Sequence, residues 1–485
     1  MRLKNIIENL DIVKINNFKN YNISSITHIS QDVEKDGMFI CIKGNNYNGH
    51  DYIESAISLG AKCILTEDVN FSHQNVTVII VENVRVAMSV VAKNFYNRCV
   101  DQMKVVGIVG TCGKTTTSSM VEQILTLSGK KVGLIGTNGI FIDKIRQENK
   151  FTTPDPLELH YIFYQMKMLG VEIIVMEASA QAIYYKKVYG INFDICVFTN
   201  ISNEHLDFFG SVEKYARVKM DFFNSKNMKE CVVNIDDFFG RELAYKVNIP
   251  CVSYGIHEPC NSFAIDINYQ LDKTQFTANI LDDVFNLDVS FVGEYNVYNL
   301  LAALTVCKML GLEPEDLENA IKSLSDIPGR FNVFEFCGAK IIIDFAHTPD
   351  SIEKLLSHIR TYCNGKIIGL FGCVGYSDRE KRQDMAKVVS KFSDVAIITS
   401  DNPGNTPYDE ISKDIISSLS CEYYDIQDRT QAIKFALDKL NERDTLVLIG
   451  KGIENFKKIG EKRLPYSEYE TLKSLMEKIN ENRAN

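Results

Sequence analysis

The stretch Gly107-Ile-Val-Gly-Thr-Cys-Gly-Lys-Thr-Thr-Thr117 decides how this chain is built. It follows the apolar run Met103–Val109, which is typical of a buried strand, and it precedes Ser118–Leu127, whose apolar spacing predicts a helix. Glycines in such a loop let backbone N–H groups approach phosphate oxygens, and the start of the helix adds its positive end. The order strand, glycine-rich loop, helix therefore predicts a nucleotide triphosphate site.

Two side chains of the loop strengthen this prediction. Lys114 supplies a point charge for phosphate, and the hydroxyl of Thr115 can reach a magnesium ion. A strict phosphate-loop pattern would have glycine at the position of Ile108, so the pattern here is G-x-x-G-T-x-G-K-T. The alternative is an ordinary strand-to-helix turn with a chance Gly-Lys-Thr. The agreement of loop, lysine, hydroxyl and both flanking elements favours the nucleotide site.

Length and composition limit the remaining choices. A chain of 485 residues is expected to form about three domains. Its net charge of −10 argues against a general nucleic-acid binder. The 13 cysteines are scattered without a C-x-x-C pair, as expected for small buried side chains in a reducing compartment. With no signal-peptide core and no apolar run near the roughly 18 residues of a membrane span, we expect a soluble cytoplasmic protein, and we favour a monomer.

Strand and helix patterns alternate along most of the chain, which predicts an α/β fold with mostly parallel sheets. We place a first domain at residues 1–100, a central phosphate-loop domain at 101–330 and a third domain with the same α/β alternation at 331–485. Within the central domain, residues 251–292 change to short β segments and predict a small antiparallel appendage. The strands expected to carry the central site are Lys131–Gly136, Glu172–Glu177, Asp194–Thr199 and Glu230–Ile235.

Polar residues gather where predicted strands end, which is where an open α/β sheet binds its ligands. Glu177 directly follows four apolar residues, so we interpret it as a magnesium ligand, with an ion-paired or capping acid as the alternative. His205 lies in a loop with Glu204 and Asp207, although a lone loop histidine is more often structural. Lys219 has the pattern of a solvated helix lysine. Four polar loops of the third domain also follow strands, namely 344–350, 371–379, 400–404 and 450–454.

Together these residues resemble the Mur ligase family over nearly the whole chain. The match is nearest to members that add the third residue of the peptidoglycan stem peptide. In the first domain, Gly37-Met-Phe, Lys43-Gly and Gly49-His-Asp51 resemble that family's UDP-binding domain. The other motifs in the family's order are Gly107–Thr117, Thr152-Thr-Pro154, Glu177 with Ser179, Thr199-Asn with His205-Leu-Asp207, Lys219, Gly329-Arg330, His347-Thr-Pro-Asp350, Asp401-Asn-Pro403 and Gly450-Lys-Gly452.

The resemblance implies an ATP- and magnesium-dependent amide ligase acting on a UDP-MurNAc-dipeptide and a free amino acid. By position, Lys114, Lys219 and His205 would be catalytic. Thr115 and Glu177 would hold one Mg²⁺, and His205 with a carbamylated Lys219 would hold a second. The nucleotide-binding positions would be Gly110, Thr111, Gly113, Lys114, Thr115, Thr116, Asn299 and Arg330. The substrate-binding positions would be Ser30, Thr152, Thr153, Ser179, Lys187, Arg382, Asp401, Asn402, Gly450 and Glu454.

Several substrate-facing positions depart from the family pattern. The usual Glu-Val-Ser-Ser-His-Ala is Glu177-Ala-Ser-Ala-Gln-Ala182, and a usual glutamine and arginine are Tyr185 and Lys187. A usual Ser-Arg pair is Ser30-Gln31, and Ile453 replaces a histidine. Because the ATP and magnesium positions are nearly complete, ligase chemistry is better supported than the identity of the acceptor. A paralogue joining an amino acid to another carboxylate, or a degenerate nucleotide-binding subunit, are the rival interpretations.

One departure concerns the incoming amino acid. Members that add meso-diaminopimelate usually have Asp-Asn-Pro-Arg, and that arginine binds the distal carboxylate, whereas this chain has Asp401-Asn-Pro-Gly404. A planar guanidinium suits this task because it donates two parallel hydrogen bonds, and glycine donates nothing comparable. The sequence therefore predicts a different third residue, with L-lysine as the first candidate. Arg379 is a neighbouring residue that could take over the missing role.

Overall fold

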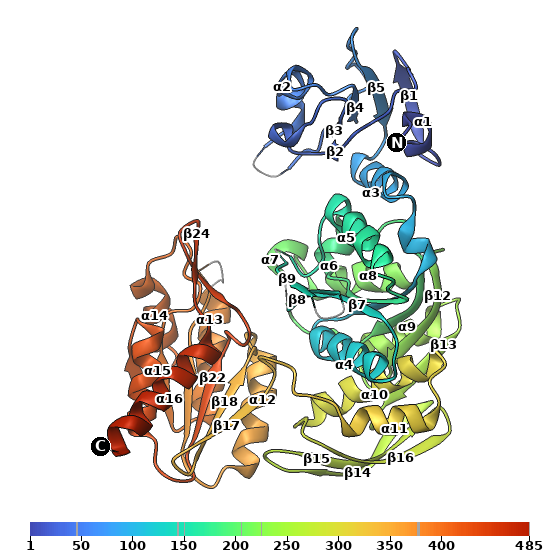
Figure 1. Ribbon diagram of the computed structural model, residues 1–485. Coiled ribbons are helices and arrows are strands. Elements are labelled where there is room, and N and C mark those ends of the chain that lie inside the picture. The colour runs from blue at the N-terminus through green and yellow to red at the C-terminus, as the bar shows by residue number, and fades with distance from the viewer. Residues whose placement is uncertain are drawn as a thin grey trace. The chain divides into compact units, whose positions relative to one another are not determined.

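The computed structural model describes residues 1–44, 47–142, 145–149, 151–204, 206–224, 226–375 and 379–484. The chain forms two compact units, one with most of the residues before Tyr254 and the other with most of those from Tyr254 onward (Figure 1). Each unit is described here by itself. The boundary falls inside strand β13 (Cys251–Gly255).

The first unit begins with a five-stranded sheet of order β1-β5-β4-β3-β2, parallel except for β1. The bounds are β1 Ile12–Asn16, β2 Ile26–Thr27, β3 Met38–Ile40, β4 Cys63–Thr66 and β5 Thr77–Val81, with helices α1 Leu3–Ile6, α2 Ile53–Ser58 and α3 Val84–Phe95. Strands β4 and β5 are buried along their whole length because both faces of the sheet are covered. Hydrophobic clusters on the two faces, around Met38 and around Phe39, form this core.

The phosphate-loop strand lies at the centre of the next sheet, whose strands within this unit have the order β12-β11-β6-β10-β7-β8-β9. The first five pair in parallel, and β7, β8 and β9 continue as antiparallel strands. The bounds are β6 Lys104–Val109, β7 Val132–Gly136, β8 Gly139–Ile142, β9 Ile145–Gln147, β10 Ile173–Glu177, β11 Phe193–Phe198 and β12 Met228–Asn234. The carboxyl ends of β6, β10 and β11 therefore share one edge, as the sequence predicts.

Helices α4 Lys114–Leu127, α5 Pro156–Met168, α6 Ala180–Tyr184, α7 Leu206–Phe209, α8 Val212–Phe223 and α9 Phe238–Lys246 alternate with these strands. Helix α4 begins at Lys114, four residues before the predicted start at Ser118. The polar run Lys114–Ser119 lacks apolar spacing, yet Thr115 to Ser119 are buried in the first turns. The helix pattern was hidden because small hydroxyl residues, which pack as readily as alanine there, occupy the buried positions.

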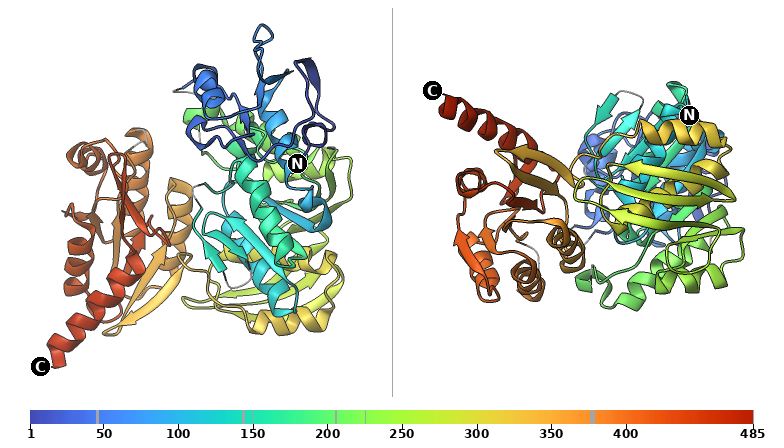
Figure 2. Two further views of the ribbon diagram at one scale, coloured as in Figure 1. Left: turned by 45° about the horizontal axis from the view of Figure 1, so that its top comes forward. Right: turned by 90° about the horizontal axis from the view of Figure 1, so that it is seen from below.

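The second unit opens with the predicted appendage. Strands β14 Ser262–Tyr269, β15 Thr274–Ile280 and β16 Asp283–Val289 pair antiparallel, which confirms the expectation for this segment. Figure 2 (right) shows them as one layer, against which helices α10 Glu294–Met309 and α11 Pro314–Lys322 pack. Helix α10 is buried on most sides, so its sequence is apolar almost throughout.

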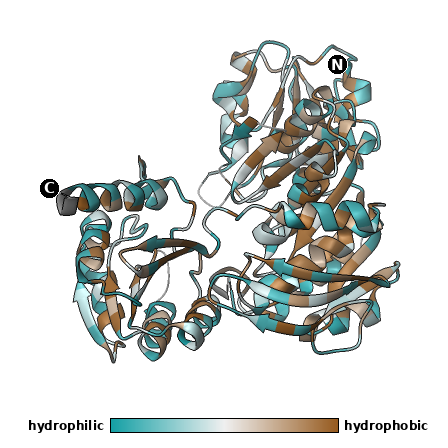
Figure 3. Cartoon of the chain, turned by 60° about the horizontal axis from the view of Figure 1, so that its bottom comes forward, coloured by the Kyte–Doolittle hydropathy of each residue, from teal (hydrophilic) through white to brown (hydrophobic). Residues whose placement is uncertain are grey.

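The rest of the second unit is a six-stranded sheet of order β17-β18-β22-β19-β20-β21, parallel except for the edge strand β17. Its strands are β17 Asn332–Phe336, β18 Ala339–Asp344, β19 Ile367–Phe371, β20 Val395–Ile398, β21 Glu422–Asp425 and β22 Thr445–Ile449. Helices α12 Pro349–Tyr362, α13 Arg379–Phe392, α14 Tyr408–Ile416, α15 Arg429–Lys439 and α16 Glu468–Ala484 accompany it, with the hairpin β23 Phe456–Ile459 and β24 Lys462–Pro465. Figure 3 shows hydrophobic strands inside and hydrophilic helix faces outside. These sheets confirm the predicted α/β class.

Candidate functional site

Glycine gives the phosphate loop its shape at two positions. Gly110 has φ +155° and Gly113, the N-cap of α4, has φ +84°. A Cβ on Gly110 would lie 1.8 Å from the Thr199 Oγ1 atom, so no larger residue fits there. The left-handed conformation at Gly113 turns the chain directly into α4, which directs the first N–H groups of the helix toward the loop.

The loop is also held from the neighbouring strand end by Thr199 and Asn200. The Asn200 carbonyl accepts from the Thr111 N–H at 2.8 Å, and its side-chain Oδ1 accepts from the Cys112 N–H at 2.9 Å. The Cys112 carbonyl accepts from Thr199 Oγ1 at 2.7 Å and Asn200 Nδ2 at 3.1 Å. Sequence reasoning assigned Asn200 no role. The Thr-Asn pair directly after a buried strand was the available signal.

Lys114 lies over the loop that precedes it. Its Nζ donates to the carbonyls of Gly110 at 2.9 Å and Thr111 at 2.7 Å. These two carbonyls hold the ammonium at the loop, where it can contact an anion at the mouth of the loop. This is the arrangement expected of a phosphate-binding lysine.

The Glu177 carboxylate is the buried centre of the site, with only 1% of the residue exposed. Its Oε2 accepts hydrogen bonds from the hydroxyls of Thr115 and Thr137, both at 3.1 Å, and its Oε1 accepts from the Thr137 N–H at 2.9 Å. A Cβ on Gly136 would come within 2.2 Å of Oε1, so glycine makes room for the carboxylate. Hard oxygen donors on Thr115 and Glu177 are the ligand types that Mg²⁺ prefers.

Three predicted substrate residues connect to Glu177, one through Thr137 and two through its main-chain carbonyl. Thr152 Oγ1 lies 3.1 Å from Thr137 Oγ1, and Thr153 Oγ1 donates to the Glu177 carbonyl at 2.8 Å. Thr153 Oγ1 also accepts from the N–H of Ser179, whose side chain caps α6 by accepting from Ala182 N at 3.2 Å. The structure therefore brings together the predicted magnesium residues and the predicted substrate threonines.

Lys219 is not the solvated lysine that its helix pattern indicates. Only 1% of it is exposed, and its Nζ donates to the Tyr215 hydroxyl and lies 3.5 Å from Thr111 Oγ1. The Tyr215 hydroxyl is 3.2 Å from that same Thr111 Oγ1. Lys219 thus lies directly under the phosphate loop, as the resemblance implies. His205, its expected partner, lies outside the described residues.

Lys187 lies at the other side of the substrate threonines. Its Nζ forms an ion pair with Asp155 at 3.0 Å and lies 4.6 Å from the centre of the Phe151 ring. Nearby, the Arg85 guanidinium lies 4.7 Å from the centre of the Tyr185 ring. Ser30 is in the short 3₁₀ helix Ser30–Asp32 of the first sheet's domain, with a half-buried side chain. The two cation–aromatic contacts both lie within the first unit.

Asn299 and Arg330 belong to the second unit. Asn299 is buried in α10, where its Nδ2 donates to Asn296 Oδ1 at 3.1 Å. The Arg330 guanidinium lies 4.7 Å from the centre of the Phe345 ring. Burial raises the pKa of the Asp344 carboxyl, and the positive charge of Arg330 opposes that rise.

Two strand-end loops of the second unit, 400–404 and 450–454, meet at Lys451, a fully buried lysine. Because the resemblance predicts that they bind the incoming amino acid, we call them the amino-acid loops. Its Nζ donates to Asn402 Oδ1 at 2.7 Å and Glu454 Oε2 at 2.8 Å, and lies 3.1 Å from Asp401 Oδ1. Asn402 Nδ2 donates to the same Glu454 oxygen at 2.8 Å. Sequence reasoning placed Gly450 and Glu454 in the site but gave Lys451 no contact. In the structure it joins both loops.

Arg382, a predicted substrate residue, is buried in the structure. It is 4% exposed, and its guanidinium donates to Asp414 at 2.9 Å and the Gly375 carbonyl at 2.8 Å. These contacts connect the loop at Gly375 to helix α14. Arg379, on the first turn of the same helix, is exposed and 3.3 Å from Asp414. Gly404 has φ +56° with open space around its Cβ position.

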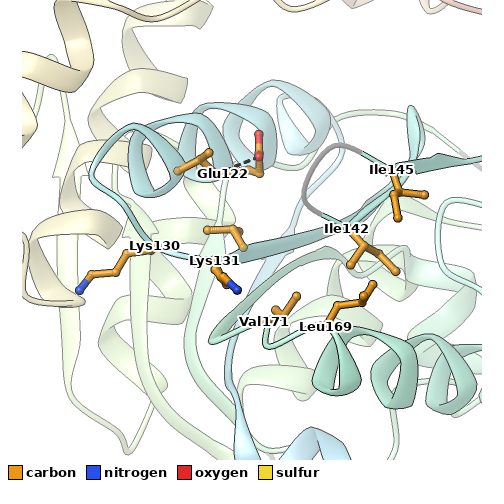
Figure 4. Close-up of a pocket in the computed structure, with 9 residues that line it drawn as sticks. Glu122, Lys130, Lys131, Ile142, Ile145, Leu169 and Val171 are labelled. Carbon is orange, nitrogen blue, oxygen red and sulfur yellow. Dashed lines mark hydrogen bonds between the residues drawn. The ribbon is translucent and has the colours of Figure 1, made fainter.

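A small pocket lies away from these residues, at the far end of α4 (Figure 4). It has a cavity volume of about 130 Å³ and is lined by Glu122, Thr126, Lys130, Lys131, Val132, Ile142, Ile145, Leu169 and Val171. Burial raises the pKa of the Glu122 carboxyl, although a hydrogen bond from Thr126 at 3.1 Å opposes this. The predicted site residues do not line this pocket.

The described residues contain no cluster of three or more His, Cys, Asp or Glu side chains arranged to hold a metal ion. Over the same part of the chain, no helix is both long and apolar enough to cross a membrane. The predicted magnesium site at Thr115 and Glu177 differs from such a cluster, because it would use one carboxylate, one hydroxyl and the neighbouring phosphate loop.

Comparison with known protein families gives three adjoining matches. Residues 22–108 match the Mur ligase family catalytic domain, residues 108–307 the Mur ligase middle domain, and residues 329–452 the Mur ligase glutamate ligase domain. Among curated proteins, the chain is 36% identical to the UDP-N-acetylmuramoyl-L-alanyl-D-glutamate--2,6-diaminopimelate ligase 1 of Clostridium acetobutylicum. That similarity covers 99% of this chain and 100% of the relative.

Solved structures show the same fold. A UDP-N-acetylmuramoyl-L-alanyl-D-glutamate--2,6-diaminopimelate ligase superposes with a TM-score of 0.70 at 24% identity, over 96% of this chain and 97% of its own. The MurF ligase of Thermotoga maritima, solved in complex with ADP, superposes with a TM-score of 0.64 at 21% identity, over 95% and 98%. The shared architecture, of a central mostly parallel sheet with flanking domains, extends over nearly the whole chain.

Proposed function

Because the chain belongs to the Mur ligase family, we propose that it is an ATP-dependent, ADP-forming ligase that adds the third amino acid to UDP-MurNAc-L-Ala-D-Glu in peptidoglycan synthesis. The name of the 36% identical relative supports this acceptor. The observation that carries the proposal is the chain of hydrogen bonds from Thr115 through Glu177 to Thr153. It joins the nucleotide end of the site to the expected peptide end through one residue.

The reaction has two steps. A free carboxylate oxygen of the dipeptide attacks the γ-phosphorus of ATP, the bond to the bridging oxygen breaks, and ADP leaves an acyl phosphate behind. The amino group of the incoming residue then attacks the acyl carbon, loses a proton, and the tetrahedral intermediate expels inorganic phosphate. Both reactants of the first step are anions, so the site must supply positioned positive charge more than covalent chemistry.

Lys114 meets this demand in the first step. Its ammonium, held by the carbonyls of Gly110 and Thr111, would contact the transferred phosphate oxygens. Thr115 and Glu177 would hold one Mg²⁺, which when bound would neutralise phosphate charge. The buried carboxylate fits that role because Thr137 fixes its orientation by two hydrogen bonds. Thr152, Thr153 and Ser179 would position the dipeptide carboxylate beside it.

Lys219 would serve a second Mg²⁺ together with His205, after carbamylation turns its ammonium into an anion. Its burial beneath the loop supports a specific role, because lysine side chains are rarely buried away from water. Tyr215 and Thr111, whose hydroxyls surround its Nζ, would donate hydrogen bonds to the carbamate oxygens. Asn299 and Arg330 would contact the adenine and phosphates from the second unit.

The amino acid would bind at the loops around Lys451. Glu454 is the outer carboxylate of this group, so it would accept hydrogen bonds from a substrate ammonium. Asp401, Asn402 and Gly450 shape the same place. For the backbone carboxylate of the amino acid, the exposed Arg379 is better placed than the buried Arg382.

Two observations bear on which amino acid is added. The curated relative is named for 2,6-diaminopimelate, which supports a diamino acid. Gly404 lacks the guanidinium expected for the distal carboxylate of that substrate, and leaving a buried carboxylate unpaired costs about 2–5 kcal/mol. The prediction from Gly404 therefore stays that L-lysine is preferred, and diaminopimelate is the competitor to test.

The proposal also covers the cell compartment, the oligomeric state and the domain boundaries. We expect a cytoplasmic enzyme acting as a monomer without nucleic acid, with domain boundaries near residues 100 and 330. The 13 free cysteines, many of them buried, support a reducing compartment.

Phosphate release tests the function directly. Purified protein with ATP, Mg²⁺, UDP-MurNAc-L-Ala-D-Glu and a diamino acid should release phosphate, and omission of either the dipeptide or the amino acid should abolish release. Release that persists without the dipeptide would indicate an ATPase. Release only when a different carboxylate replaces the dipeptide would favour the paralogue interpretation, which the departures at Ala180 and Gln181 raise.

A further inference from the structure

A buried ion pair lies behind the amino-acid loops. Arg429, the first residue of α15, and Glu468, the first residue of α16, are both 0% exposed. Arg429 Nη2 donates to Glu468 Oε1 at 2.8 Å, and its Nε lies within 3.2 Å of both carboxylate oxygens. Figure 1 shows α15, α16 and β22 side by side. Nothing in the proposed chemistry uses either residue.

Arg429 also connects to both loops of the amino-acid site. Its Nη2 donates to the carbonyl of Ile449 at 3.0 Å, and Ile449 is the last residue before Gly450. Two residues before Arg429, the carbonyl of Gln427 accepts from Ser400 N–H at 3.1 Å, and Ser400 directly precedes Asp401. The segment that carries Arg429 is thus tied to the ends of β20 and β22, which carry the two loops.

Charged side chains also connect the Arg429–Glu468 pair to the residues that are expected to bind the amino acid. Asp401 and the Arg429–Glu468 pair lie close enough that Asp401 acts on the pKa of both partners, raising that of Arg429 and of Glu468. Asp401 Oδ1 is 3.1 Å from Lys451 Nζ, which holds Glu454 at 2.8 Å. Alternating charges therefore run from the buried helix start to the carboxylate nearest the expected amino acid.

A buried pair of this kind is poor evidence of stability, because the cost of desolvating two charges offsets their attraction. What it provides is a fixed geometry. The Arg429 guanidinium has a planar set of donors that a carboxylate and a carbonyl can satisfy in only one orientation. Its location between the two loops makes that geometry relevant to the site.

We propose that Arg429 and Glu468 are positioning residues for the incoming amino acid, acting through Ile449, Asp401 and Lys451 on Glu454. This rests on the proposed ligase function. Neither residue touches substrate. They hold the two strand-end loops at the spacing at which Glu454 accepts from the substrate ammonium, so they set the affinity for the amino acid and leave the phosphate loop unaffected.

The test is the KM for the amino acid in a Glu468→Gln variant, which keeps the side-chain size but removes the charge. We expect that KM to rise at least tenfold, while the KM for ATP stays within twofold and kcat at saturating amino acid within threefold. Glu468→Asp, which keeps the charge, should recover much of the affinity. Glu470→Gln on the exposed face of the same first turn is the matched control and should behave as wild type.

The outcomes separate this inference from the function on which it rests. If the KM values for amino acid and ATP rise together, or if activity falls only in proportion to lost folded protein in a melting curve, the pair is merely structural and the inference is overturned. If Glu468→Gln does not fold, the same split is measured on Arg429→Lys, which keeps the charge but removes the planar set of donors, and an unchanged amino-acid KM in that variant overturns the inference. A wild-type protein that releases no phosphate with any amino acid overturns the proposed function, and this inference with it.

Discussion

The phosphate loop and the amino-acid loops both lie at strand ends, but they are held in different ways. Main-chain groups, glycines and the short polar residues Thr199 and Asn200 shape the phosphate loop. Buried charged side chains, with Lys451 at the centre, hold the amino-acid loops. The glycines of the phosphate loop can be recognised in its own sequence, although Thr199 and Asn200 are distant in the chain. The buried charges that hold the amino-acid loops cannot be recognised in this way, because each is paired with a residue far along the chain.

The largest effect should come from the phosphate loop. Lys114→Ala removes a lysine charge that carbonyls hold at the loop, so kcat should fall by at least about 10²–10³-fold while the melting temperature changes little. Steady-state phosphate release measures the loss. Lys104→Ala, at the exposed start of the same β6 strand, is the control and should keep wild-type rates. A Lys114→Ala enzyme with near-normal rates would refute the phosphate-loop assignment.

The next effect concerns Lys219. Lys219→Ala should reduce activity by about 10- to 100-fold or more, as expected for a lost metal ligand, and short carboxylic acids should restore part of it by replacing the carbamate. Lys214→Ala on the exposed face of the same α8 helix should have no effect. If rescue fails and mass spectrometry under carbon dioxide shows no added carboxyl group, the carbamate assignment is wrong.

The phosphate loop and the amino-acid loops also differ in how much of each could be predicted from the sequence. Glu177 could be found from its place after Ile173–Met176, because parallel strands deliver their ends to one edge. The contacts of Lys451 and Arg429 could not be predicted, since Lys451 meets Asn402 across 49 positions and Arg429 meets Glu468 across 39. The burial of Arg382 could not be predicted for the same reason: its partner Asp414 is 32 positions away.

The positions of the central strands could be predicted from the sequence, whereas those of the edge strands were harder to predict. The apolar runs of the central strands predicted their positions to within a few residues, because strands covered on both faces must be apolar. Edge elements such as β21, exposed over most of its length, lack that pattern and were missed. The start of α4 was misplaced because small hydroxyl residues fill its buried positions.

A smaller effect should appear in substrate choice. Wild type should prefer L-lysine over meso-diaminopimelate when the two compete for product, and Gly404→Arg should shift selectivity toward diaminopimelate by about tenfold or more. Gly404→Ala shares the strain at φ +56° but lacks the guanidinium, so it should leave selectivity unchanged. A clear wild-type preference for diaminopimelate would contradict the prediction from Gly404.

The smallest effect should be on stability at the pocket beside α4. Because burial raises the folded-state pKa of Glu122, its contribution to stability is fully present at low pH and is lost as pH rises through that pKa. Glu122→Gln should therefore raise the melting temperature slightly at pH 8, and the difference should vanish near pH 4. Equal melting temperatures at pH 8 would show that Lys130 and Lys131 at the rim already compensate the charge.

The most direct test of the ligase assignment is the product itself. After incubation with ATP, Mg²⁺, UDP-MurNAc-L-Ala-D-Glu and L-lysine or diaminopimelate, mass spectrometry should find the UDP-MurNAc-tripeptide, with one ADP and one phosphate formed for each new amide bond. ATP consumption without a tripeptide product, for either amino acid, would contradict the account.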